Sequence, residues 1–185
     1  MPYPGWTLVH LRAASHGGLT YQNTHPFIKG DWAFCHNGIW GDHKIVKAAY
    51  SNLFKFEGQT DSEVAAQLFS SIGPQKFIKS VTSGVYLTLH ITGEVYTICN
   101  EFADLDIAKT QYGYIVASEL PETLKATKIK KGWIDFNPLG QINKKAYIKD
   151  KFVYNLNGFS KKELEEWSMQ DITGEVIERG YYSYD

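Results

Sequence analysis

The sequence predicts an α+β fold built largely from antiparallel sheets, because its helix patterns and its strand patterns occur in separate groups. Two helical stretches follow one another before residue 74, whereas alternating strand patterns dominate from residue 84 onward. Hydrophobic residues make up 43% of the 185 residues and aromatic residues 15%, which is typical of a chain with a packed core. One domain over residues 1–185 is the simplest organisation at this length.

Two strands are predicted near the start of the chain. Residues 6–13, "WTLVHLRA", alternate loosely and predict a buried strand. Residues 31–36, "DWAFCH", predict a second strand. This strand ends at Asn37-Gly38, a pair that accepts positive φ angles and therefore favours a turn.

Two helices are predicted next. Residues 42–54 place apolar side chains on one face, with Asp42 as the N-cap. The second helix has Thr60 and Glu63 in the capping-box spacing at its start. Gly73-Pro74 is expected to end it.

The rest of the chain alternates strand patterns with one more helix. Residues 84–99 predict a β-hairpin around a Thr92-Gly93 turn, and residues 112–118 and 144–156 are further strand candidates. The segment 160–167, "SKKELEEW", opens with a second capping box and predicts a third helix.

Charge and cysteine content exclude several classes of function. Nineteen basic and twenty acidic residues give a net charge of −1, which does not favour nucleic acid or acidic membranes as partners. No apolar run is long enough to span a membrane, and the start has no secretory signal pattern. Two cysteines without a CxxC pair indicate neither a disulfide framework nor structural zinc. A cytoplasmic protein without a cofactor is expected.

Residues 11–42 contain an unusual density of polar side chains and glycines. Five of the six histidines lie before residue 44, but none of them forms a metal-binding pattern, so no metal is expected. A Cys35-His36 catalytic pair is also disfavoured, because neighbours along a strand point to opposite faces. Cys35 is better interpreted as a buried structural thiol.

A binding site for an anionic group and an amide is a third interpretation of this stretch. Arg12 offers a planar fork for a carboxylate, and the backbone and amide of Asn37-Gly38 can donate to an oxyanion. Asp61 in the first turn of a helix can pair with an ammonium group. Each feature also has an ordinary structural explanation: a surface ion pair, a turn and a favourable helix-dipole interaction.

Four short motifs in order resemble class II glutamine amidotransferases of the N-terminal-nucleophile (Ntn) hydrolase superfamily. They are "LRAASHG", "NTHPF", "CHNGIW" and "QTDSEV". The resemblance is firm over residues 8–72 and looser through 84–99, 112–120 and 128–142. It implies an Ntn-hydrolase-like αββα sandwich whose last strand-turn-strand lies over 128–142.

The resemblance also implies a role for each site residue. Arg12 would hold the α-carboxylate of glutamine, assisted by Ser15, where the family more often has Thr. His16-Gly17 would shape the same loop. Asn37 and Gly38 would form the oxyanion hole, and Asp61 would bind the α-amino group.

The family's nucleophile is a cysteine at the mature N-terminus, several dozen residues before the arginine motif. Here only a short segment precedes Arg12, and removal of Met1 would expose Pro2. Cleavage before Thr7 or Cys35 would not supply a suitable nucleophile either. We therefore expect the first strands and the nucleophile to be missing. Ala13, where a bulky residue is common in the family, is a lesser departure.

Three functions remain open at this point. The chain could be a catalytically degenerate domain that binds glutamine, a related small amino acid or a partner protein. It could be an active amidotransferase subunit whose cysteine segment comes from another chain or an upstream start. It could also be a structural or regulatory interaction protein without a ligand site. Missing strands would expose a sheet edge, so we expect a second copy in a homo-oligomer, a partner chain or the C-terminal segment near "GEVIERGYYSYD" to cover it.

Overall fold

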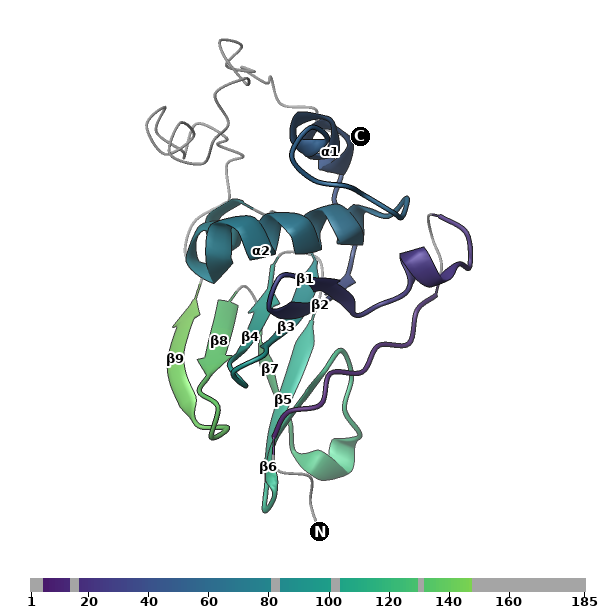
Figure 1. Ribbon diagram of the computed structural model, residues 1–185. Helices are drawn as coiled ribbons and strands as arrows, with labels where there is room; N and C mark the ends of the chain where they lie inside the picture. Colours follow the sequence, from purple (N-terminus) through teal and green to yellow (C-terminus); the bar gives the residue numbers. More distant parts are fainter. Residues whose placement is uncertain (1–4, 14–16, 81–83, 101–103, 130–131, 148–185) are drawn as a thin grey trace.

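The computed structural model describes residues 5–13, 17–80, 84–100, 104–129 and 132–147. Within them the chain forms two helices and two antiparallel sheets, as the sequence predicts (Figure 1). The predicted helix at 160–167 and the second half of the 144–156 strand lie outside the described residues. No helix in the described part is both long enough and apolar enough to cross a membrane.

The larger sheet has six strands in the order β1-β2-β3-β4-β8-β9. They are β1 (Phe27–Lys29), β2 (Trp32–Asn37), β3 (Val85–His90), β4 (Val95–Cys99), β8 (Gly132–Phe136) and β9 (Ile142–Tyr147). The smaller sheet has the order β6-β5-β7. Its strands are β5 (Leu105–Thr110), β6 (Gly113–Ala117) and β7 (Thr127–Ile129). The hairpin predicted at 84–99, the strand at 112–118 and the strand-turn-strand at 128–142 are confirmed.

Alternation along the strands divides the apolar side chains between two cores. On β3, Tyr86 faces the helices, whereas Val85 faces the smaller sheet. On β8, Trp133 and Ile134 divide in the same way. The order of layers is therefore helices, large sheet, small sheet (Figure 1). Among the described residues no α-helix covers the outer face of the small sheet, so three layers of the αββα sandwich are present in this part.

The prediction of a strand over residues 6–13 is wrong. The segment is extended and its exposure alternates, but it is not assigned to a strand. Trp6 packs against Phe136, with their rings 4.9 Å apart, whereas Val9 and Leu11 are 71% and 94% exposed. The alternation of the sequence is reflected in alternating exposure, but the segment is not a buried strand. A strand additionally needs a hydrogen-bonded neighbour, and local sequence does not specify one.

The two helices differ from prediction mainly at their ends. Helix α1 (His43–Tyr50) follows Asp42, but the side chain of Asp42 makes no capping hydrogen bond. The φ and ψ of Asp42 are −86° and 5°, outside the extended region that an N-cap residue normally adopts. Helix α2 (Asp61–Ser80) is interrupted at Gly73, as predicted, but helical structure resumes after the break.

The start of α2 is held by the buried carboxylate of Glu63. The Thr60 side chain accepts a hydrogen bond from the Glu63 N–H at 3.2 Å, which confirms half of the capping box. The Glu63 carboxylate instead accepts from the backbone N–H groups of Glu57 and Gly58 and from Lys29 Nζ, at 2.8 to 2.9 Å. Burial alone would raise the Glu63 pKa, but these hydrogen bonds outweigh it and lower the pKa.

We predict that Glu63→Gln lowers the free energy of unfolding by about 3 kcal/mol, because it leaves a partly buried cation and two backbone donors without their anionic acceptor. Urea denaturation followed by circular dichroism measures the change. The matched control is Asp104→Asn, which breaks the exposed Lys128–Asp104 pair at 3.0 Å and is expected to change little. Equal losses in the two variants would contradict the importance assigned to Glu63.

Candidate functional site

The turn after β2 brings two stretches of backbone unusually close together. Asn37 ends β2 with an exposed side chain, and Gly38 follows with a φ of +147°. A Cβ atom on Gly38 would lie 2.8 Å from the Cα of Gly84, the residue immediately before β3. Glycine is thus required for both conformation and space. The pleat of β2 presents the Asn37 amide outward, where it is available to a ligand.

Asp61 is the first residue of α2, and its carboxylate links the start of this helix to the turn after β2. Its Oδ2 accepts a hydrogen bond from the Trp40 N–H at 2.7 Å, and its Oδ1 accepts from the Ser62 N–H at 2.9 Å. The side chain is 14% exposed. A carboxylate can accept about four hydrogen bonds, so Asp61 retains capacity for an ammonium group. The hydrogen bond from the Trp40 N–H therefore ties Asp61 to the segment that follows Asn37 and Gly38.

The N-terminal loop reaches the same helix end. A Cβ atom on Gly17, whose φ is +73°, would lie 2.9 Å from Asn23 Nδ2 and 3.4 Å from the Thr60 methyl group. Buried Asn23 also accepts from the Gln59 N–H at 2.8 Å. These contacts place Gly17 beside the residue that precedes Asp61. Ser15 and His16 lie outside the described residues.

Arg12 is half-buried on the extended segment and lies near a pair of histidines. The His10 and His25 rings are 4.1 Å apart. Burial, together with the charges of His10, His36 and Arg12, lowers the pKa of His25 to about 3. The electrostatic interaction of Arg12 with His25 thus places Arg12 beside the histidines of this region.

The histidine cluster itself was not predicted. His25 and His36 are 8% and 3% exposed, and burial lowers the pKa of His36 to about 4. In the described residues no group of three or more histidine, cysteine or acidic side chains is arranged to hold a metal ion. The concentration of histidines before residue 44 was the available signal. In the structure, this concentration of histidines corresponds to a group of neutral rings that pack beneath the site.

The two cysteines are both buried. Cys35 is 2% exposed, and burial raises its pKa to about 12. Cys99 is fully buried on β4. Since thiolates are the reactive form of cysteine, the environment of Cys35 opposes nucleophilic chemistry. The prediction of a structural thiol at Cys35 is confirmed.

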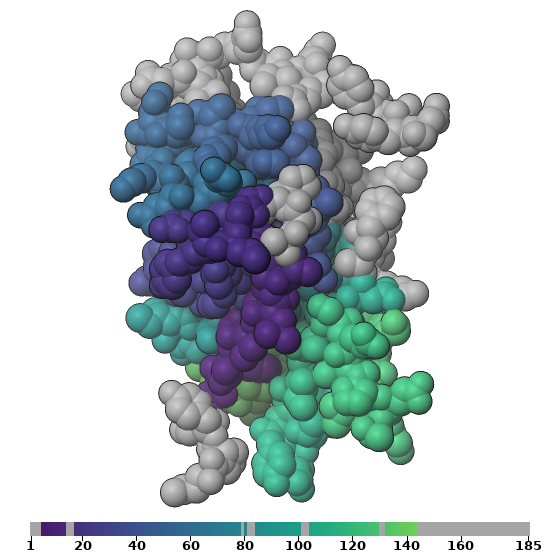
Figure 2. Space-filling model, turned by 90° about the vertical axis from the view of Figure 1, so that its right-hand side faces the viewer, coloured from purple at the N-terminus to yellow at the C-terminus, as the bar shows by residue number. Residues whose placement is uncertain are grey.

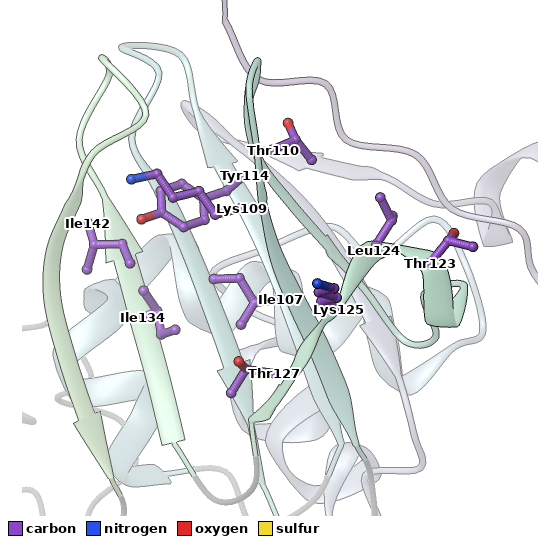
Figure 3. Close-up of a pocket in the computed structure, with 10 residues that line it drawn as sticks. All are labelled: Ile107, Lys109, Thr110, Tyr114, Thr123, Leu124, Lys125, Thr127, Ile134 and Ile142. Carbon is purple, nitrogen blue, oxygen red and sulfur yellow. The ribbon is translucent and has the colours of Figure 1, made fainter.

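A cavity of about 490 Å³ lies away from these residues, where the two sheets diverge (Figure 3). Ile107, Tyr114 and Ile134 form part of its apolar wall, and Lys109 and Lys125 also line it. None of the predicted site residues lines it. The candidate site is instead a surface formed by the turn after β2, the start of α2 and the N-terminal segment.

Comparisons with known proteins agree with this geometry. Residues 6–90 match the profile of the family described as glutamine amidotransferases class-II. Glutamine–fructose-6-phosphate aminotransferase of Streptococcus agalactiae serotype V is 26% identical over 178 residues, covering 94% of this chain and 28% of the relative. The enzyme of the same name from Xanthomonas campestris pv. campestris is 45% identical over 60 residues, covering 32% of this chain and 10% of the relative.

A solved structure shares the fold. The glutamine aminotransferase class-II domain protein from Silicibacter pomeroyi superposes with a TM-score of 0.53 and 18% sequence identity. The match covers 70% of this chain and 72% of that chain. Residues 6–90 of this chain are therefore similar to class II glutamine amidotransferases, and the chain shares the fold of such a domain. The matched regions cover only 10% and 28% of the length of these two relatives.

We predict that Gly38→Ala lowers the free energy of unfolding by about 2 kcal/mol or more, because it combines an unfavourable φ with a clash against Gly84. Gly41→Ala is the matched control, since a Cβ there meets nothing within 4 Å. Thermal and urea denaturation measure both variants. A stable Gly38→Ala variant would show that the two backbones do not approach as described.

Proposed function

We propose that this chain binds glutamine, or a closely related small amino acid, at the surface formed by Arg12, Asn37-Gly38 and Asp61. Arg12 pairs with the α-carboxylate, and Asp61 with the α-ammonium group. The Asn37 amide and the Gly38 backbone face the side-chain carbonyl, while Ser15 and His16-Gly17 complete the loop around the carboxylate. The hydrogen bond from the Trp40 N–H to Asp61 carries the proposal, because it ties the ammonium-binding residue to the oxyanion turn.

The family match and the relatives' names support glutamine as the ligand. Hydrolysis of glutamine additionally requires a nucleophile. Cys35 is buried with a raised pKa and Cys99 is buried on β4, so neither thiol is suited to attack a bound amide. We therefore propose that residues 1–185 bind the ligand without turning it over. An alternative is an active assembly in which another chain or an upstream segment supplies the cysteine.

The extended N-terminal segment supports a partner proposal. Val9 and Leu11 expose their side chains, and residues 5–13 pair with no strand in the described part of the chain. Figure 2 shows this segment, in purple, running over the surface beside the green strands of the second sheet. An extended segment that belongs to no sheet and exposes apolar side chains is a template for strand addition. We propose that a second copy or a partner chain pairs with this segment. Such pairing is what the third possible function, an interaction protein, would require.

We predict that the purified chain binds glutamine in isothermal titration calorimetry and releases no ammonia from it. Arg12→Ala and Asp61→Asn should each weaken binding by roughly tenfold to a hundredfold, because each removes a charged partner of the ligand. Lys109→Ala, in the remote cavity, is the control and should bind as the unmodified chain does. Ammonia release would favour the active alternative, and no heat at millimolar glutamine would contradict the binding proposal.

We predict that the chain self-associates or binds a partner through residues 5–13. Sedimentation velocity should then show a concentration-dependent complex that Leu11→Asp disrupts. Leu139→Asp changes a leucine that is 83% exposed in the β8–β9 turn and should leave the complex intact. A monomer at all concentrations, together with no partner recovered from cell extract, would contradict this proposal.

A further inference from the structure

His36 lies one residue before the proposed oxyanion turn, but its side chain faces the interior. The pleat of β2 exposes Asn37 and leaves His36 only 3% exposed. Its ring stacks on Tyr86 of β3, with centroids 4.6 Å apart and an interplanar angle of 5°. The ring is therefore fixed directly beneath the turn whose amide is proposed to face the ligand.

From this position His36 reaches the start of α2. Its Nδ1 lies 3.1 Å from Ser62 Oγ and 3.9 Å from Asp61 Oδ2. Ser62 Oγ lies in turn 3.4 Å from Asp61 Oδ1. The serine hydroxyl has one proton to donate. If His36 Nδ1–H donates to Ser62, then the Ser62 hydroxyl is free to donate to Asp61, and one continuous chain of hydrogen bonds ends at the carboxylate.

The surroundings of His36 keep its ring neutral. Burial lowers its pKa, the Asp61 carboxylate raises it, and His10 on the N-terminal segment lowers it again. Its Nε2 is buried and has no hydrogen-bond partner among the described residues. That nitrogen faces the backbones of Gly38 and Gly84, where an added Cβ would lie 3.0 and 2.7 Å from it. A second proton on the ring would therefore have no acceptor.

We propose that His36 is a positioning residue for ligand binding, which orients the Asp61 carboxylate toward the ligand's α-ammonium group through the hydroxyl of Ser62. This inference rests on the proposed function of Asp61. It assigns His36 no contact with the ligand. The effect of His36 should consequently be confined to ligands that carry an α-ammonium group.

Two substitutions separate this role from general support of the fold. His36→Asn keeps a hydrogen-bonding atom near the position of Nδ1, whereas His36→Gln places one near the position of Nε2. Both variants lose the ring that stacks on Tyr86. The ligands are glutamine and 5-amino-5-oxopentanoate, which is glutamine without its α-amino group. Calorimetry measures the dissociation constant of each ligand with each variant.

We expect His36→Gln to weaken glutamine binding about tenfold and to leave 5-amino-5-oxopentanoate binding unchanged, because one oriented hydrogen bond is lost. His36→Asn should retain glutamine binding within about threefold of the unmodified chain. Ser62→Ala removes the intermediate hydroxyl and should reproduce the loss if His36→Gln does not fold. Equal loss of both ligands, or equal behaviour of the two His36 variants, would overturn this inference while leaving glutamine binding in place. Failure of the unmodified chain to bind glutamine would overturn both proposals.

Discussion

The buried carboxylate of Glu63 is the constraint on which the geometry of the candidate site depends. It accepts hydrogen bonds from two consecutive backbone N–H groups before α2 and from Lys29 of β1. A buried charge is tolerated only when such partners compensate for its lost hydration. The loop, the helix start and the edge of the large sheet are therefore held in one arrangement. Asp61 lies two residues before Glu63, so the same contacts fix its position.

The opposite side of the site depends on the pleat of β2. Alternation along this strand directs Asn37 outward and His36 inward. Asn37 therefore lies at the surface of the site, and His36 packs beneath it. The paired glycines at positions 38 and 84 then allow the two backbones to meet above the His36 ring. Arg12 and Asp61 are side chains of opposite charge on the two sides of the proposed site. These charges match the two charged groups of an α-amino acid.

Local patterns predicted the elements well and their long-range partners poorly. The Thr60–Glu63 spacing correctly located the start of α2, but the Glu63 carboxylate binds Lys29, 34 residues away in sequence. Likewise, alternation over residues 6–13 predicted a buried strand but could not indicate whether another strand lies alongside. The short strands β1 and β7 have too few residues for a periodic signal. Motif order, by contrast, predicted the family because it encodes spacing that the folded structure requires.

Binding an amino acid and reacting with it require different features of the same fold. The described residues provide features suited to binding but no accessible cysteine thiolate. Holding an amino acid needs fixed charges and a shaped turn, which Asp61, Trp40 and Gly38 provide through short contacts. Attack on its amide needs an accessible thiolate or an activated hydroxyl near that turn. Cys35 is on the strand that leads to the turn, yet its burial stabilises the protonated thiol. In the proposed arrangement, a nucleophile supplied by a pairing strand would join this site without altering the contacts proposed to hold the ligand, so the proposed binding does not depend on a nucleophile among the described residues.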